Sequence, residues 1–273
     1  MVLTLTPLAH IPLIRHGDDL ADILLTSLRN SHIELRDNDI LVLTSKVVSK
    51  SEGRMVDLAS VTPGERAIEL AGRSEKDPRV VELMLQESSE VLRVRAGTII
   101  VEHRLGFVCA NAGIDHSNVD PPLPLALSGA EAETKRGEAT GGMAGEWVLL
   151  LPRDPDLSSR AIREKIESKT GRRIGVMIID SHGRAWRIGT VGVCIGLSGI
   201  PPLVDERGWK DLFGRELRIT ILGAADELAA AASLVMGQAA EGTPAVHVRG
   251  FPYPLREGSL KELLRPKEQD MFR

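Results

Sequence analysis

The order of apolar and polar residues along the chain predicts strands and helices that are mixed without regular alternation. Short apolar runs that empty into polar segments predict strands. These runs lie before residue 10, at 40–44, twice within 97–115 with a turn near Gly106, and at 174–180, 190–199, 216–223 and 245–250. Apolar residues at helical spacing predict helices at 62–73, 78–93 and 224–240, and one that Asp156 or Ser158 caps and Gly171 ends. Such an order favours an α+β fold with mixed sheets.

Two segments do not follow these periods. The stretch 44–54, TSKVVSKSEGR, is interpreted as a basic loop after the strand at 40–44. The stretch 120–145 is rich in Pro, Gly, Ala, Thr and Glu and has no sustained period, so we expect an exposed insertion there.

Composition narrows the class of protein. The chain has 273 residues, of which 42% are apolar, so it can bury a substantial core. Thirty-four basic and 38 acidic residues give a net charge of -4, and aromatic residues make up 3%, which argues against nucleic-acid binding. Cys109 and Cys194 stand alone, without zinc spacing or a disulfide framework. With neither a signal peptide nor an apolar run long enough for a membrane, the expected location is the cytoplasm.

Two predicted strands end in the same way. FVCANAGID ends at Asp115, and IGVMIID ends at Asp180, which Ser181 follows. A carboxylate at the end of a buried strand lies at the rim of the core, where two such groups repel unless a cation lies between them. Each aspartate could also simply cap a turn. The sequence leaves both interpretations open, a hard-metal site and a pair of turn caps.

Other segments carry weaker signals. Ser45, Lys46 and Lys50 follow a strand, where they could contact phosphate oxygens or form a solvated surface. Arg184 and Arg187 follow Asp180 and could stabilise a transferring phosphoryl group, or lie on the surface. The seven histidines have no metal spacing, and those at 16, 32, 103, 182 and 247 are interpreted as structural or surface residues.

Longer motifs give a resemblance that spans nearly the whole chain. IPLIRHGDDL, TSKVVSKSEGR, CANAGIDHSN, LLLPRDPD, IIDSHGRAWRIGTVGVCIGLSGI, GRELRIT and ADELAAAASLVMGQ occur in the order of one family. The chain resembles the coenzyme F420:L-glutamate ligases, the CofE family.

The resemblance implies a single CofE-like ligase domain over 1–273, with a two-lobed α+β fold of largely antiparallel sheets. It implies an enzyme that uses GTP to add L-glutamate, successively and in γ-linkage, to the deazaflavin coenzyme. It also implies Mn²⁺ or Mg²⁺ at two sites, K⁺ as an activator, and a homodimer.

Site residues follow from the resemblance by position. The residues implied to bind GTP are Ile11, Pro12, Leu13, Ile14, Ser45, Lys46, Lys50, Asn118, Met236, Gly237, Gln238, Ala239, Ala240, Glu241, Gly242 and Thr243. Those implied to bind metal are Asp115, Asp180, Ser181 and Gln238. Arg184 and Arg187 are the residues predicted to act in catalysis.

Departures from the family pattern bear on the second metal site. Ser181 stands where the family has threonine, which retains the hydroxyl group, and Gln238 stands where some members have an acid. The segment 120–145 is longer than the usual connector.

Two other functions use the same residues. A two-metal phosphohydrolase would release phosphate from GTP without glutamate or deazaflavin. A nucleotide-binding protein would hold GTP without turnover.

Overall fold

The computed structural model describes residues 2–119 and 146–271, so the predicted insertion at 120–145 lies outside the described residues. The chain forms two compact units. The first comprises Met1–Glu52 and Pro152–Arg273, and the second comprises Gly53–Leu151. Within the described ranges, no helix is long and apolar enough to cross a membrane.

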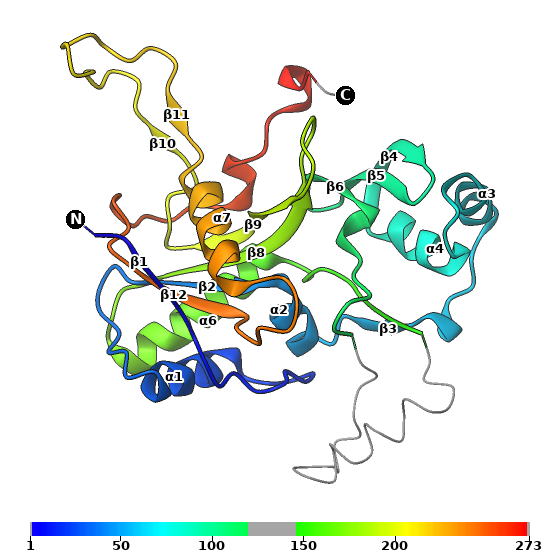
Figure 1. Cartoon of the computed structure of the whole chain (residues 1–273), viewed down its shortest axis with the longest axis horizontal. Coiled ribbons are helices and arrows are strands. Elements are labelled where there is room, and N and C mark those ends of the chain that lie inside the picture. Colours follow the sequence, from blue (N-terminus) through cyan, green and yellow to red (C-terminus); the bar gives the residue numbers. More distant parts are fainter. Residues whose placement is uncertain (1, 120–145, 272–273) are drawn as a thin grey trace. The chain divides into compact units, whose positions relative to one another are not determined.

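The first unit is built around a five-stranded sheet with the order β1-β12-β2-β8-β9 (Figure 1). Its strands are β1 (Thr4–Pro7), β2 (Ile40–Thr44), β8 (Gly175–Gly183), β9 (Thr190–Ser198) and β12 (Ala245–Arg249), with β10 (Val204–Asp205) and β11 (Ile221–Leu222) in a separate pair. Its helices are α1 (Leu20–Asn30), α2 (Ser45–Ser51), α6 (Pro155–Thr170) and α7 (Ala224–Met236), with short 3-10 helices η3 (Leu260–Glu262) and η4 (Lys267–Gln269).

Strand direction confirms the predicted α+β class. β2 and β8 run parallel, and the other neighbours in this sheet are antiparallel. A parallel pair matters for function because polar residues that follow its two strands emerge at the same edge of the sheet.

Helices α6 and α7 approach β9 closely, at glycines. A Cβ at Gly192 would lie 2.6 Å from the carbonyl oxygen of Ala229 on α7, and one at Gly196 would lie 2.3 Å from Cβ of Pro155 on α6. A bulge between these glycines changes the register, since Ile178 pairs with Gly196 but Ile179 pairs with Cys194. The predicted close packing of the alanine-rich helix is confirmed, because Ala225, Ala229 and Ala232 are fully buried.

A buried ionic cluster fixes the start of β2. The Asp39 carboxylate, 2% exposed, lies 2.9 Å from Nε2 of His247 and accepts hydrogen bonds from the Arg249 guanidinium at 2.9 and 2.7 Å. Burial alone would raise the pKa of Asp39, but these bonds outweigh it and hold the pKa well below its usual range. The cluster therefore depends on an ionised carboxylate.

In its described residues, 53–119 and 146–151, the second unit has two small sheets and two α-helices. Strand β3 (Met55–Asp57) pairs with β7 (Trp147–Leu149), and β4 (Ser88–Arg95), β5 (Thr98–His103) and β6 (Val108–Ala110) form an antiparallel sheet. The helices are α3 (Glu65–Ser74) and α4 (Pro78–Gln86), with 3-10 helices η1 (Leu58–Ser60) and η2 (Asn111–Gly113). A buried ion pair between Arg54 and Glu87, 2.8 Å apart, lies in this unit.

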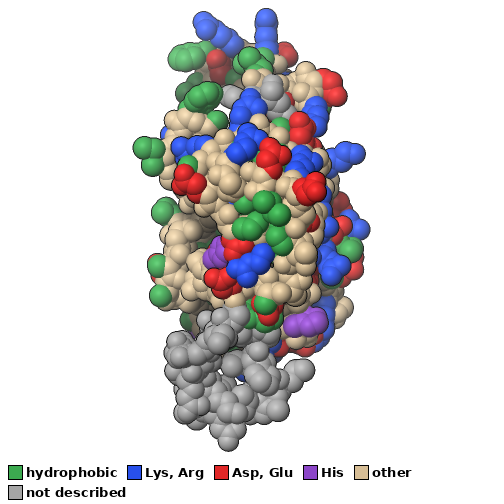
Figure 2. Space-filling view, turned by 90° about the vertical axis from the view of Figure 1, so that its right-hand side faces the viewer, with side chains coloured by type: hydrophobic (Ala, Val, Ile, Leu, Met, Phe, Trp, Pro, Cys, Tyr) green, Lys and Arg blue, Asp and Glu red, His purple; other side chains and the backbone are tan. Residues whose placement is uncertain are grey.

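Surface charge is mixed. On the face that Figure 2 shows, basic and acidic side chains are interspersed, in keeping with 34 basic and 38 acidic residues in the sequence.

Several predicted elements are wrong in detail. The predicted loop at 44–54 contains helix α2, because Ser45, Val48 and Ser49 recur at helical spacing and are buried together. The helix predicted over 78–93 ends at Gln86, and β4 follows, because pairing with β5 overrides the helical spacing of its apolar residues.

Other corrections concern ends of elements. Strand β8 does not end at Asp180 but continues to Gly183, because β9 pairs with it as far as Thr190. Only Ile221–Leu222 of the strand predicted at 216–223 forms, since its partner β10 has two residues. Asp154 caps α6 in place of Asp156 or Ser158, because its carboxylate accepts the amide of Leu157. The helix predicted over 224–240 ends at Met236, because Gly237 takes a positive φ.

Candidate functional site

The centre of the candidate site is a hydrogen bond between the residue that follows β2 and a residue of its parallel neighbour β8. Thr44 of β2 is the register partner of Ile179 of β8, so the next residues, Ser45 and Asp180, are neighbours. The Ser45 hydroxyl donates to Oδ1 of Asp180 at 2.6 Å across 135 positions of sequence. The fold thus brings a predicted nucleotide-binding residue to a predicted metal ligand.

Asp180 is held as a carboxylate at this edge. Its side chain is 17% exposed, and Nε2 of His182 lies 3.2 Å from Oδ2. Burial alone would raise the pKa of Asp180, but the hydrogen bond and charge of His182 and the hydrogen bond from Ser45 hold the pKa below its usual value. Each carboxylate oxygen keeps lone-pair capacity for another ligand.

Ser181 and Gln238 form a second contact beside Asp180. The Ser181 hydroxyl donates to Oε1 of Gln238 at 3.0 Å, and Nε2 of Gln238 donates to Oγ of Ser233 at 3.0 Å. Ser233 lies on α7, so this helix orients the Gln238 amide. The two residues predicted to share the second metal site are therefore in direct contact.

The segment from Met236 to Thr243 folds back on itself. The Thr243 hydroxyl donates to the carbonyl oxygen of Met236 at 2.9 Å, and the Ala239 amide donates to the Glu241 carboxylate at 2.7 Å. Hydrogen bonds from its own amide and that of Ala239 lower the pKa of Glu241. Gly237 has a φ of 76°, and a Cβ there would lie 2.2 Å from the Glu241 carboxyl carbon. This compact turn follows α7 directly.

The other nucleotide-binding residues predicted in this unit lie on α2 and between β1 and α1. Lys46 and Lys50 are four residues apart on α2, so they share one side of the helix. In the segment Ile11–Ile14, Leu13 is 63% exposed and Ile14 is buried.

Asp115 belongs to the second unit, and its surroundings differ from those of Asp180. Its backbone exchanges two hydrogen bonds with Leu149, at 3.0 and 2.9 Å. Its Oδ1 accepts from the amide of Ser117 at 2.8 Å and from its hydroxyl at 2.7 Å. Asp115 therefore caps the turn that leads to Asn118, which has a φ of 56°.

Arg184 and Arg187 lie in the turn after β8. The Arg187 amide donates to the carbonyl oxygen of Arg184 at 3.4 Å, and both side chains are exposed. With a strand rise of about 3.3 Å per residue, Arg184 lies roughly 13 Å along the chain from Asp180. In the described residues neither guanidinium contacts the Asp180 carboxylate, so the structure does not bring these two predicted catalytic residues to it.

The donors around Asp180 suit a hard cation. Asp180, Ser181 and Gln238 offer carboxylate, hydroxyl and amide oxygens, which Mg²⁺ and Mn²⁺ prefer. Within the ranges that the structure describes, no cluster of three or more His, Cys, Asp or Glu residues could hold a metal ion. A cation at Asp180 would therefore rely on neutral oxygen ligands and on its substrates, as Mg²⁺ sites commonly do.

Sequence reasoning missed two residues that support the site. His182 was interpreted as structural or surface, yet it faces Asp180 because residues two apart on a strand share a side. Asp226 of α7 accepts the amide of Cys194 at 2.9 Å, at the bulge of β9. Burial raises the pKa of Asp226. The i, i+2 spacing was a signal for His182, but the sequence carries no signal for Asp226 because its partner is a bulge amide.

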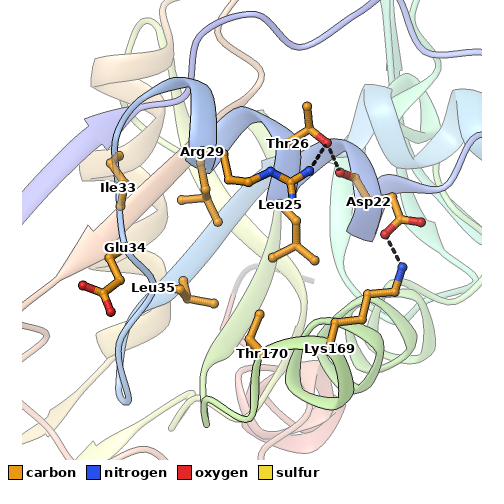
Figure 3. Close-up of a pocket in the computed structure, with 10 residues that line it drawn as sticks. Asp22, Leu25, Thr26, Arg29, Ile33, Glu34, Leu35, Lys169 and Thr170 are labelled. Atoms are coloured by element: carbon orange, nitrogen blue, oxygen red, sulfur yellow. Dashed lines mark hydrogen bonds and ion pairs between the residues drawn. The ribbon is translucent and has the colours of Figure 1, made fainter.

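A separate pocket of about 490 Å³ lies in the first unit (Figure 3). As far as the chain is described, its lining comes from α1, the segment after it and the end of α6, and it includes none of the predicted site residues. Four of its polar side chains interact with one another, through an ion pair between Lys169 and Asp22 and a hydrogen bond from Arg29 to Thr26 (Figure 3).

Comparison with known proteins finds relatives that match this chain along nearly its whole length. Residues 9–250 match the family model described as F420-0:Gamma-glutamyl ligase. A protein of Methanothermobacter thermautotrophicus named coenzyme F420:L-glutamate ligase is 44% identical over 275 residues, which cover 100% of both chains. A protein of the same name from Methanopyrus kandleri is 44% identical over 95% of this chain and 93% of its own length. Another from Archaeoglobus fulgidus is 41% identical over 98% of this chain and 95% of its own length.

Proposed function

Because the chain belongs to the F420-0:gamma-glutamyl ligase family, we propose that it is a GTP-dependent ligase that adds L-glutamate to the deazaflavin coenzyme F420 precursor. Additions are successive and γ-linked, and GDP and phosphate are the other products. The observation that carries the proposal is the contact between Ser45 and Asp180, in a chain similar to such ligases along its whole length.

In the proposed reaction, a carboxylate oxygen of the acceptor attacks the γ-phosphorus of GTP, and GDP leaves. The amine of glutamate then attacks the carbonyl carbon of the acyl phosphate, phosphate leaves, and the amine loses a proton. Both steps need phosphate oxygens to be held and their charge offset.

The residues of the first unit divide these tasks. Ser45, Lys46 and Lys50 would hold phosphate oxygens, and the segments Ile11–Ile14 and Met236–Thr243 would hold the rest of GTP. Arg184 and Arg187 would stabilise charge on the transferring phosphoryl group after movement of their turn. The exposure of both arginines supports this role, because it leaves them free to move.

Asp180 would hold Mn²⁺ or Mg²⁺ at one site, and Ser181 with Gln238 would help to hold the metal at a second site. When bound, the cation would neutralise charge on the phosphates. Two contacts between oxygen atoms support this assignment, from Ser45 to Asp180 at 2.6 Å and from Ser181 to Gln238 at 3.0 Å. On the second unit, Asp115 is proposed as a metal ligand and Asn118 as a nucleotide contact. K⁺ is proposed as an activator, and a homodimer as the assembly.

The test is a mass spectrum of the coenzyme after incubation with GTP, Mn²⁺, L-glutamate and the tail-less deazaflavin, with controls that omit each one. A series of added glutamyl masses that requires GTP is expected. Phosphate release from GTP without any addition would instead indicate a phosphohydrolase, and GTP binding without release would indicate a binding protein.

A further inference from the structure

We propose that the indole of Trp186, at the end of the β8–β9 hairpin, is a stacking platform for the aromatic ring of the acceptor. This inference rests on the proposed function and names how the substrate is recognised. The β8–β9 hairpin belongs wholly to the first unit and projects beyond the sheet (Figure 1).

Trp186 is presented to solvent to an unusual degree. Its side chain is 90% exposed, and Ile188, two residues on, is fully exposed. The chain has only three tryptophans, and aromatic residues make up 3% of it, so an exposed indole is not a consequence of aromatic abundance. Large apolar side chains gathered on a protruding segment mark a surface that another molecule covers.

The backbone presents the indole at some cost. Trp186 has a φ of 64°, a left-handed conformation that bulky residues rarely adopt. The amide of Arg187 closes the turn on the carbonyl oxygen of Arg184 at 3.4 Å. Strain of this kind persists where the surrounding structure imposes it, and it is common at ligand-binding segments.

The charged residues around Trp186 indicate which kind of ligand would bind there. The segment 181–190, SHGRAWRIGT, holds Arg184 and Arg187 and no acidic residue. In the described chain, neither guanidinium forms an ion pair within the protein. An exposed indole between two arginines suits a molecule that has both an aromatic ring and negative charge. The deazaflavin acceptor has a ring system and a carboxylate, so it matches both features.

The arm from β10 to β11 offers a matched control. Trp209 on this arm is 52% exposed, and Leu212 and Phe213 beside it are 99% and 86% exposed. The arm carries charges of both signs, including the ion pair between Asp205 and Arg207. It therefore has exposed aromatic surface but lacks the purely basic setting of Trp186.

The experiment compares Trp186→Ala, Trp186→Phe and Trp209→Ala in the intact protein. We expect Trp186→Ala to raise the acceptor KM roughly ten- to hundredfold, the loss that removal of one stacking residue produces. The KM values for GTP and glutamate should stay unchanged. Trp186→Phe should restore most of the acceptor affinity that Trp186→Ala loses. Trp209→Ala should leave the acceptor KM unaltered.

Calorimetric titration with the tail-less deazaflavin alone separates this inference from the proposed function. If the wild type makes no glutamyl product yet binds the deazaflavin, and Trp186→Ala weakens that binding, the inference stands and the proposed function fails. If the wild type is active and Trp186→Ala keeps its acceptor KM and affinity, the inference fails alone. An equal rise in acceptor KM in Trp209→Ala would also overturn the inference. So would a change of oligomeric state in Trp186→Ala, measured by light scattering, because it would assign this surface to a second copy of the chain.

Discussion

Asp115 and Asp180 have similar sequence contexts but different surroundings in the structure. Each follows an apolar run, and each has a serine within two residues. The Asp115 carboxylate accepts from the amide and hydroxyl of Ser117, two residues away in sequence. Asp180 binds Ser45, which is 135 positions away, and lies 3.2 Å from His182.

The difference comes from strand pairing. Asp115 follows a 3-10 helix and joins Leu149 in an isolated bridge, and its carboxylate accepts from the hydroxyl of its own turn. Asp180 lies in a strand with a parallel neighbour, so the residue that follows that neighbour meets it. Local sequence can predict a turn cap, whereas a long-range polar contact requires knowledge of which strands pair.

The largest expected effect is that of Asp180→Asn. The substitution keeps the size of the side chain but removes the negative charge, so kcat for glutamate addition should fall roughly 10³-fold. The mass-spectrometric assay under single-turnover conditions measures the loss, and circular dichroism checks the fold. Full activity in a folded Asp180→Asn protein would refute the role of this carboxylate.

A third carboxylate, Asp39, is a control for Asp180, because we expect its substitution to affect stability and not the site. It is paired with a histidine, as Asp180 is, but it is fully buried, and its cluster lies at the start of β2. Asp39→Asn should cost about 3–5 kcal/mol in the free energy of unfolding, because it leaves Arg249 with a neutral partner. Urea denaturation measures this cost. The exposed Asp37→Asn, which replaces a charged acceptor of the Arg173 amide by a neutral one, should cost less than about 1.5 kcal/mol.

The Asp39 cluster should also make the stability of the fold depend on pH under acidic conditions. Because the pKa of Asp39 is lowered in the folded state, its contribution is fully present above the unfolded carboxyl pKa of about 3.9. The contribution decreases as the pH falls below that value towards the folded pKa. Asp39→Asn should therefore reduce the dependence of stability on pH below about 4, as acid titrations of both proteins would measure.

Asp115→Asn tests whether the turn cap is also a ligand. Asparagine retains an oxygen that can accept from Ser117, so the turn and the fold should be kept. If the carboxylate binds metal, activity should fall by roughly a hundredfold or more, beyond what loss of a supporting residue costs. Activity close to that of the wild type would leave Asp115 with its structural role alone.

The smallest effects should come from the two serines. Ser45→Ala removes the hydroxyl that binds Asp180, and kcat should fall about tenfold, the equivalent of one hydrogen bond to a charged group. Ser117→Ala leaves the amide of residue 117 bonded to Asp115, so its effect should be less than about twofold. Steady-state kinetics of the two variants measure both values of kcat. Equal losses of kcat in Ser45→Ala and Ser117→Ala would contradict the comparison.

Much of the fold was predictable, because apolar runs and helical spacing fix local structure. Strands at 40–44 and 245–249 and the alanine-rich helix are confirmed within a few residues. Helix α2 was missed because its buried positions include two serines, and β4 was missed because Val91 and Leu92 fit the helical spacing of the residues before them. In both, tertiary contacts decided the outcome.

The site was predictable only in part. The residue types at Asp180 and Ser181 pointed to oxygen ligands, but the partnership of Ser45 with Asp180 depends on the parallel register of β2 and β8. Likewise, Asp226 acquires its partner only through a bulge in β9. Pairing and bulges arise from the whole sheet, which no single segment encodes.

The most direct test is the binding of Mn²⁺, followed by electron paramagnetic resonance, to the wild type, Asp180→Asn and Asp115→Asn in the presence of GDP. We predict that the wild type binds Mn²⁺ and that Asp180→Asn loses affinity at least about a hundredfold while remaining folded. Unchanged Mn²⁺ affinity in Asp180→Asn would contradict the assignment of this carboxylate as the centre of the site.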